Sequence, residues 1–96
     1  QRLELNGTRW RVLHTPGHSP GGITLHHAPS ATALVGDALF AGSIGRTDFP
    51  SCSFEQLEHS IKTRLYTLPG ETTIYPGHGE TSTIGEERDT NPFVRP

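Results

Sequence analysis

Three turns rich in glycine and proline constrain this chain most, because each ends a short β-type run on a side chain that can bind a metal. They place His18 in HTPGH, Asp37 in VGD and His78 in YPGHG. No helical spacing of three or four residues relates the three positions, so only a fold that gathers strand ends at one edge brings them together. Imidazole and carboxylate are the ligands of hydrolytic zinc-type sites, and we expect such a site at that edge.

The β-type runs predict most of a sheet. Residues 3–5 and 10–13 flank Asn6-Gly7, a pair that favours a type I′ turn and therefore a hairpin. Further strands are expected at residues 23–27, 33–35 and 72–75. His26 and His27 alternate along one of these strands, so one of the two is expected to face solvent.

Two helices are predicted after these first strands. The longer one spans residues 54–67, begins with a capping box from Ser53 to Gln56, and has apolar side chains at helical spacing: Phe54, Leu57, Ile61, Leu65 and Leu68. A short helix is expected from Thr83 to about Asp89, and Asn91-Pro92 closes it. Residues 40–52 are interpreted as a long surface loop. The predicted order ββββαβα gives one sheet layer with helices on one side, so its other face needs a partner.

Composition indicates a partial domain. The chain has 96 residues, 31% of them hydrophobic, with 11 glycines and 8 prolines, which supplies little core for that length. It contains no methionine, so residue 1 is not an encoded initiator. We therefore expect residues 1–96 to form a single partial domain, a piece of a longer polypeptide.

Charge and hydropathy exclude two classes of partner. The net charge is −2 and no run of Lys or Arg occurs, so we expect no nucleic-acid binding. No apolar stretch approaches the length of a membrane span, so no membrane partner is expected. The lone Cys52 fits a reducing compartment and is interpreted as a plain free thiol, and a cytoplasmic location is expected.

The three turns, in this order and with these neighbours, resemble the last three ligand motifs of the metallo-β-lactamase superfamily. Residues 42–50 (GSIGRTDFP) narrow the resemblance to its glyoxalase II-like, or hydroxyacylglutathione hydrolase-like, branch. The resemblance implies an α/β fold, the C-terminal half of an αββα sandwich. The first ligand motif of that family, HxHxDH, does not occur in the 96 residues. The implied partner is therefore the missing N-terminal half of the domain.

The resemblance also implies roles for individual residues. His18 would be the third ligand of a first metal, Asp37 the bridging and catalytic carboxylate, and His78 a ligand of a second metal. The cofactors would be two divalent ions, most probable as zinc, with iron or manganese also suited to these ligands. A metal-bound hydroxide would then attack a small glutathione thioester. Arg46 would bind a substrate carboxylate; the alternative, which we favour, is that Arg46 pairs with Asp48 and holds the loop.

Some features depart from this family pattern or carry no chemistry. Ser51-Cys52-Ser53 stands where bacterial relatives usually have two glycines after the proline, which bears on substrate fit and not on the metal ligands. His14 is considered as a partner that orients a ligand. His26, His27 and His59 are assigned no role.

Two other interpretations stay open at this point. A persulfide dioxygenase-like relative would use one iron, with His18 and Asp37 as ligands and His78 as a bystander. From a different class, the chain could be a non-catalytic half-domain or a complementing subunit, since three ligands divided between two metal positions hold a dinuclear centre poorly. We expect the isolated chain to bind metal weakly and to hydrolyse thioesters negligibly.

Overall fold

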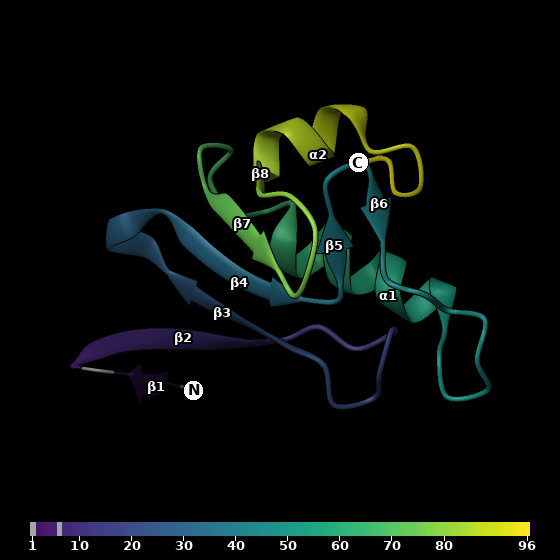
Figure 1. Cartoon of the computed structure of the whole chain (residues 1–96), viewed down its shortest axis with the longest axis horizontal. Helices are drawn as coiled ribbons and strands as arrows, with labels where there is room; N and C mark the ends of the chain where they lie inside the picture. The colour runs from purple at the N-terminus through teal and green to yellow at the C-terminus, as the bar shows by residue number, and fades with distance from the viewer. Residues whose placement is uncertain (1, 6) are drawn as a thin grey trace.

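The computed structural model describes residues 2–5 and 7–96 and shows a twisted sheet with helices on one side (Figure 1). The main sheet has the order β1-β2-β3-β4-β7-β8, and β4 pairs with β7 in parallel while its other pairs are antiparallel. Its strands are β1 (Arg2–Leu5), β2 (Thr8–His14), β3 (Ile23–His27), β4 (Thr32–Gly36), β7 (Thr73–Pro76) and β8 (Ser82–Thr83). The predicted β1–β2 hairpin is confirmed, and Asn6 of its turn lies outside the described residues.

The first helix packs against the sheet through the apolar side chains that recur at helical spacing from residue 57 to 65. Helix α1 (Phe54–Ser60) continues into a π-helical segment, η2 (Ile61–Leu65), where Tyr66 N donates to Ile61 O at 2.8 Å. Leu57, Ile61 and Leu65 are fully buried, as the spacing predicts. Phe54 is 42% exposed and does not belong to the buried stripe, because it is the first residue of the helix, one turn before Leu57. The core that these side chains share with the sheet contains Ala33, Val35 and Ile74.

The helix starts are capped as the sequence predicts, with one difference. Ser53 Oγ accepts from Gln56 N at 3.1 Å, and Thr83 Oγ1 accepts from Glu86 N at 3.1 Å at the start of α2 (Ile84–Thr90). The reciprocal half of the first capping box is replaced, because Ser53 N donates to Gly17 O at 2.8 Å instead. This bond ties the helix start to the turn that carries His18.

The segment expected to be a long surface loop is partly structured. Strands β5 (Leu39–Phe40) and β6 (Ser43–Ile44) form a separate two-stranded antiparallel sheet, and Leu39 is fully buried. Ile44 packs against the core and Gly45 is buried. Two-residue strands are too short to show an alternating pattern, so the sequence contained no periodic signal for this hairpin. A short 3₁₀ turn, η1 (Ala28–Ser30), connects β3 to β4.

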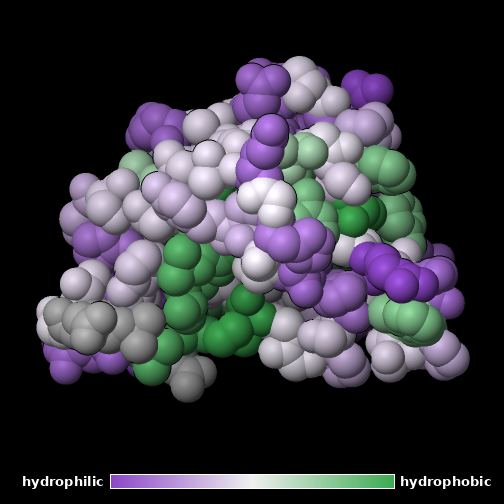
Figure 2. Space-filling model, in the orientation of Figure 1, coloured by the Kyte–Doolittle hydropathy of each residue, from purple (hydrophilic) through white to green (hydrophobic). Residues whose placement is uncertain are grey.

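The sheet face opposite the helices is apolar and incompletely covered. The strand register places Trp10, Val12, Leu25 and Leu34 on this face, all half-buried, together with Leu3 at 40% and Tyr75 at 45% exposure. Figure 2 shows apolar side chains gathered over the strands of the N-terminal half. An apolar surface of this kind is typical of a contact with another layer, as expected for a sheet that needs a partner. Among the described residues, no helix has the length and apolarity needed to cross a bilayer.

Candidate metal centre

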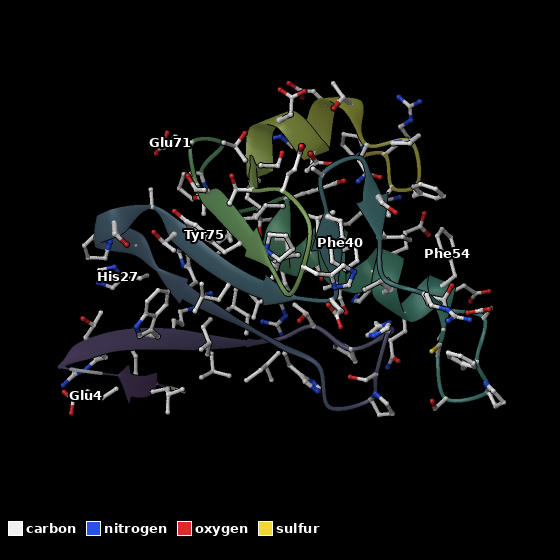
Figure 3. The ribbon with its side chains drawn as sticks, in the orientation of Figure 1. Glu4, His27, Phe40, Phe54, Glu71 and Tyr75 are labelled. Carbon is white, nitrogen blue, oxygen red and sulfur yellow. The ribbon has the colours of Figure 1, made fainter. Side chains whose placement is uncertain are left out.

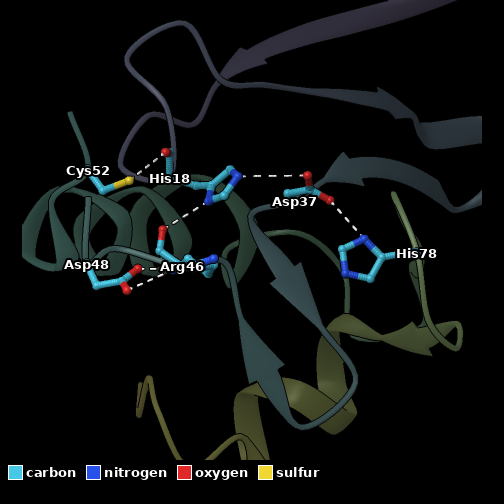
Figure 4. A network of polar contacts seen from close by, with 6 residues as sticks. All are labelled: His18, Asp37, Arg46, Asp48, Cys52 and His78. Atoms are coloured by element: carbon cyan, nitrogen blue, oxygen red, sulfur yellow. Dashed lines mark hydrogen bonds and ion pairs between the residues drawn. The ribbon is translucent and has the colours of Figure 1, made fainter. Parts of the chain in front are cut away.

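The three predicted ligands converge where β4 and β7 end. Asp37 lies between the two histidines: its Oδ2 is 3.8 Å from His18 Nε2, and its Oδ1 is 3.4 Å from His78 Nδ1 (Figure 4). The side chains are partly exposed, 32% for His18, 43% for Asp37 and 76% for His78. The predicted convergence at one sheet edge is therefore confirmed.

The tautomer of His18 follows from its other ring nitrogen. Nδ1 lies 2.9 Å from the carbonyl oxygen of Arg46, and a carbonyl can only accept, so Nδ1 carries the proton. Nε2 then keeps its lone pair and points it toward Asp37. A histidine held by a backbone carbonyl through its second nitrogen is the usual arrangement of a metal ligand.

The turn that carries His18 is anchored to the first helix and to the residues before it. Ser60 Oγ donates to Pro16 O at 2.8 Å, and Cys52 Sγ donates to His18 O at 3.1 Å. With the bond from Ser53 to Gly17, three contacts fix the backbone on both sides of the imidazole. Because this turn is rigidly placed, His18 is presented in one position.

Two glycines allow the backbone to approach Asp37 closely. A Cβ atom on Gly45 would overlap the carbonyl oxygen of Asp37 and lie 3.1 Å from the His18 ring. A Cβ atom on Gly77 would lie 2.6 Å from Asp37 Oδ1. Gly77 N also donates to Gly36 O at 2.8 Å, which joins the turn before His78 to the turn before Asp37. Only glycine fits at these two positions without displacing the backbone or the side chain of Asp37.

A cavity of about 640 Å³ opens over the three side chains, a volume within the range of small-molecule sites. Phe40 and Ile44 of the β5–β6 hairpin contribute apolar wall, and Arg46 lies at its margin. The Phe40 ring packs on His78 with 4.7 Å between centroids. The β5–β6 hairpin, most of which was predicted as surface loop, therefore lines the site.

Arg46 is engaged in a local ion pair. Its guanidinium donates to both carboxylate oxygens of Asp48, at 3.0 and 2.9 Å, and lies 4.2 Å from the centroid of the Phe49 ring. The hydrogen bond from Arg46 holds the pKa of Asp48 below its ordinary value, and the same bond raises the pKa of Arg46. The expected pairing of these two residues is confirmed, and both groups remain exposed.

Two residues of the C-terminal helix region that the sequence analysis missed hold the hairpin in place. Glu87, 2% exposed, accepts from Gly42 N at 2.9 Å and from Asn91 Nδ2 at 3.0 Å through Oε1, and from Ser82 Oγ at 2.6 Å through Oε2. Asn91 Nδ2 also donates to Ser43 O at 3.0 Å. The available signal was that Glu87 lies three residues after Ile84, on the same face of α2.

The remaining histidines lie outside this centre. His14 is exposed and its Nε2 contacts Pro20 O at 3.3 Å, so the role considered for it, orienting a ligand, is not supported. His26 is only 7% exposed and His27 is half-buried, so the expectation that one of them faces solvent is wrong. His59 is exposed, as predicted.

The donor set suits a shared carboxylate between two cations. Two ligand atoms at about 2.1 Å from a tetrahedral ion lie about 3.4 Å apart, close to the observed 3.4 and 3.8 Å. Each oxygen of Asp37 faces a different imidazole. In the part of the chain that the structure describes, no three His, Cys, Asp or Glu side chains meet around one point. These residues could thus supply two donors to each of two positions, with Asp37 common to both.

The chain is similar in sequence and in fold to known proteins. Hydroxyacylglutathione hydrolase GloC of Haemophilus influenzae is 46% identical over 92 residues, which are 96% of this chain and 43% of that protein. The crystal structure of BLEG-1 B3 metallo-beta-lactamase superposes on this chain with a TM-score of 0.92 at 41% sequence identity, and the match covers 97% of this chain and 44% of that one. The crystal structure of TTHA1623 in a di-iron-bound form superposes with a TM-score of 0.86 at 46% sequence identity. This match covers 96% of this chain and 45% of that one.

The chain thus spans less than half the length of the relatives it matches. Residues 2–78, which include all three converging side chains, match the family described as the metallo-beta-lactamase superfamily. The match agrees with the α/β architecture, in which helices cover one face of a mixed sheet. This chain therefore belongs to the metallo-beta-lactamase superfamily.

Proposed function

We propose that these residues form part of a metal-dependent hydrolase that acts on glutathione thioesters. The observation that carries the proposal is the position of Asp37, whose two oxygens each face an imidazole. The similarity to hydroxyacylglutathione hydrolase GloC supports the substrate class. His18 and His78 would each hold one metal, most readily zinc or iron, and Asp37 would bridge them.

The residues of this chain have separate tasks in that reaction. The bond from His18 Nδ1 to Arg46 O selects the tautomer of the neutral ring in which the lone pair of Nε2 is aimed at the centre. The carboxylate of Asp37 would offset the charge of two cations, and Phe40 packs against the His78 ring. Bound metals would supply Lewis-acid polarisation of the substrate carbonyl and a lowered pKa for water.

The cavity has features that suit a thioester of glutathione. Phe40 and Ile44 offer an apolar wall to the acyl part of the substrate. Arg46 lies at the margin, where its guanidinium could exchange the carboxylate of Asp48 for a carboxylate of the substrate. Because the thiolate of glutathione is a fair leaving group, the reaction needs little help from a general acid.

The proposal requires ligands beyond these 96 residues. We propose that residues 1–96 are the C-terminal half of the domain and that the N-terminal half covers the apolar face of the sheet. That half would bring the missing donors to the two positions beside Asp37. The isolated chain would then bind metal weakly and turn over thioesters negligibly.

The test is metal analysis and activity of the complete natural polypeptide, purified without added metal. We expect close to two metal equivalents per chain, turnover of S-lactoylglutathione and none of a β-lactam such as nitrocefin. A single iron would contradict the hydrolase and favour the persulfide dioxygenase-like alternative. Absence of metal would favour a non-catalytic role, and turnover of nitrocefin alone would point to lactamase activity.

A further inference from the structure

A second cavity, of about 240 Å³, lies at the end of the sheet opposite Asp37. It is lined by Arg2, Arg9, Arg11 and His26, with Ala28 and Pro29 of η1. Asp37 follows the C-terminal end of β4, whereas this cavity adjoins the turn η1 that precedes β4. In Figure 3, Glu4 and His27 mark this end of the molecule and Phe40 lies toward the other. The cavity is therefore separate from the candidate metal centre.

The strand register assembles the cationic side chains. Arg2 pairs with Arg11 across β1 and β2, and Arg11 pairs with His26 across β2 and β3, which makes one row over three strands. Arg9 lies two residues from Arg11 and so on the same face. The sequence has no run of basic residues, and the hairpin creates a cluster that linear inspection does not reveal.

This arrangement leaves positive charge without a partner. Like charges directly opposite each other destabilise a sheet, yet Arg2 and Arg11 occupy such a pair. Among residues 2–5 and 7–96, none of the three lining guanidinium groups forms an ion pair within 4 Å. Glu4, opposite Arg9, is the acidic residue on this face of the hairpin. Three guanidinium charges less one carboxylate leave two positive charges.

His26 adds a hydrogen-bonding group to the lining of the cavity. Its side chain lines the cavity at 7% exposure, and it forms no hydrogen bond to the described part of the chain. Burial lowers its pKa, as do the charges of Arg11 and His27, so the ring is neutral at pH 7. A neutral imidazole retains one N–H donor, which can bond to an oxygen of an anion in the cavity.

We propose that this cavity binds a small phosphoryl-type oxyanion. A phosphate dianion matches the two uncompensated charges, and guanidinium groups bind phosphate oxygens through paired N–H donors. The imidazole N–H of His26 supplies a further donor from the floor. The volume is below that of drug-sized pockets, so it admits the anion and only a small part of whatever carries it.

The test uses the complete natural polypeptide and inorganic phosphate as the probe. Phosphate is titrated at constant ionic strength, with chloride as the compensating salt, while the ring signals of His26 are followed by NMR. We expect saturable shifts and a rise in the pKa of His26 as phosphate binds. Arg11→Gln should weaken binding about tenfold or more, the loss expected for one charged hydrogen bond. Arg95→Gln, at an exposed position elsewhere, should not change it.

Further arms identify the source of the anion and keep the test independent of folding. Arg9→Gln changes an exposed residue outside the cross-strand row, and its loss of binding should occur with an unchanged unfolding transition. Binding to phosphatidylcholine vesicles that contain phosphatidic acid, in preference to inorganic phosphate, would assign the site to a lipid headgroup. Equal responses to chloride and phosphate, or equal affinities of Arg11→Gln and Arg95→Gln, would overturn the proposal.

Discussion

Asp37 and His78 face each other at 3.4 Å although 40 residues separate them, and the contact is made by two strand ends that are hydrogen-bonded neighbours. The second oxygen of the same carboxylate faces His18, whose tautomer is fixed by Arg46 O. A carboxylate shared in this way makes the centre depend on one side chain more than on any other.

In the complete natural polypeptide, replacing Asp37 with Asn should weaken metal retention with little effect on folding. The amide keeps the shape of the side chain but loses the negative charge that offsets two cations, and we expect at least about a tenfold weaker affinity. Elemental analysis after dialysis measures the change. Asp48→Asn, which removes an exposed carboxylate that pairs with Arg46, is the matched control. Equal metal content in both variants would contradict the assigned role.

Gly45→Ala should destabilise the fold and disturb the centre together. The added methyl group would overlap the carbonyl oxygen of Asp37, and neighbouring backbone must shift to admit it. We expect a loss of about 1–3 kcal/mol in the free energy of unfolding, the usual cost of overpacking. Denaturant unfolding gives the value. Gly21→Ala is the control, since no atom lies within 4 Å of the position its Cβ would take.

Glu87→Ala should loosen the β5–β6 hairpin from α2. Three hydrogen bonds end on the carboxylate, and their loss leaves the part-buried N–H of Gly42 and one N–H of the buried Asn91 amide without a protein acceptor. The expected cost is about 2–4 kcal/mol, with faster amide exchange at Gly42. Glu86→Ala removes an exposed carboxylate from the same helix and should cost far less. If both variants unfold alike, Glu87 does not anchor the hairpin.

The free energy of unfolding should fall at alkaline pH because Tyr66 ionises less readily in the folded state than in the unfolded state. Burial and the nearby charge of Glu87 raise its pKa to about 12 from 10, and its hydroxyl donates to Val94 O at 2.8 Å. Because the folded state holds this proton more tightly than the unfolded state, its contribution to stability is complete below pH 10. It is lost as the pH rises from 10 through 12, by an amount on the order of 1 kcal/mol.

Tyr66→Phe tests this assignment, because the variant has no proton to lose. The difference in unfolding free energy between wild type and variant should change across pH 10–12 and stay constant below it. Tyr75→Phe alters the chain's other tyrosine, which is 45% exposed, and should retain the wild-type dependence. A pH dependence in Tyr66→Phe identical to that of wild type would assign the transition to another group.

The sequence predicted that His18, Asp37 and His78 converge because the signals for it are local. Each of His18, Asp37 and His78 follows a β-type run in a Gly/Pro turn, and strand ends of one sheet edge lie together. The hydrophobic spacing likewise predicted α1, and the Ser53–Gln56 pattern predicted its N-terminal cap. These features depend on neighbours a few residues away, which a single sequence displays.

What the sequence did not reveal depends on contacts between distant segments. Strands β5, β6 and β8 have two residues each, too few for a period, and tertiary pairing alone defines them. The π-helical segment η2 and the burial of His26 depend on packing against other elements. The cluster of Arg2, Arg9 and Arg11 exists only through the register of a hairpin.

The parallel pairing of β4 and β7 sets the distance between Asp37 and His78. Since the backbone ladder and the bond from Gly77 to Gly36 set the separation of Asp37 and His78, the length of the chain between them does not. The helical part of that connection could gain or lose residues on its solvent side while Asp37 and His78 keep their positions. Variation in this crossover is thus free to reshape the surroundings of the centre without altering its spacing.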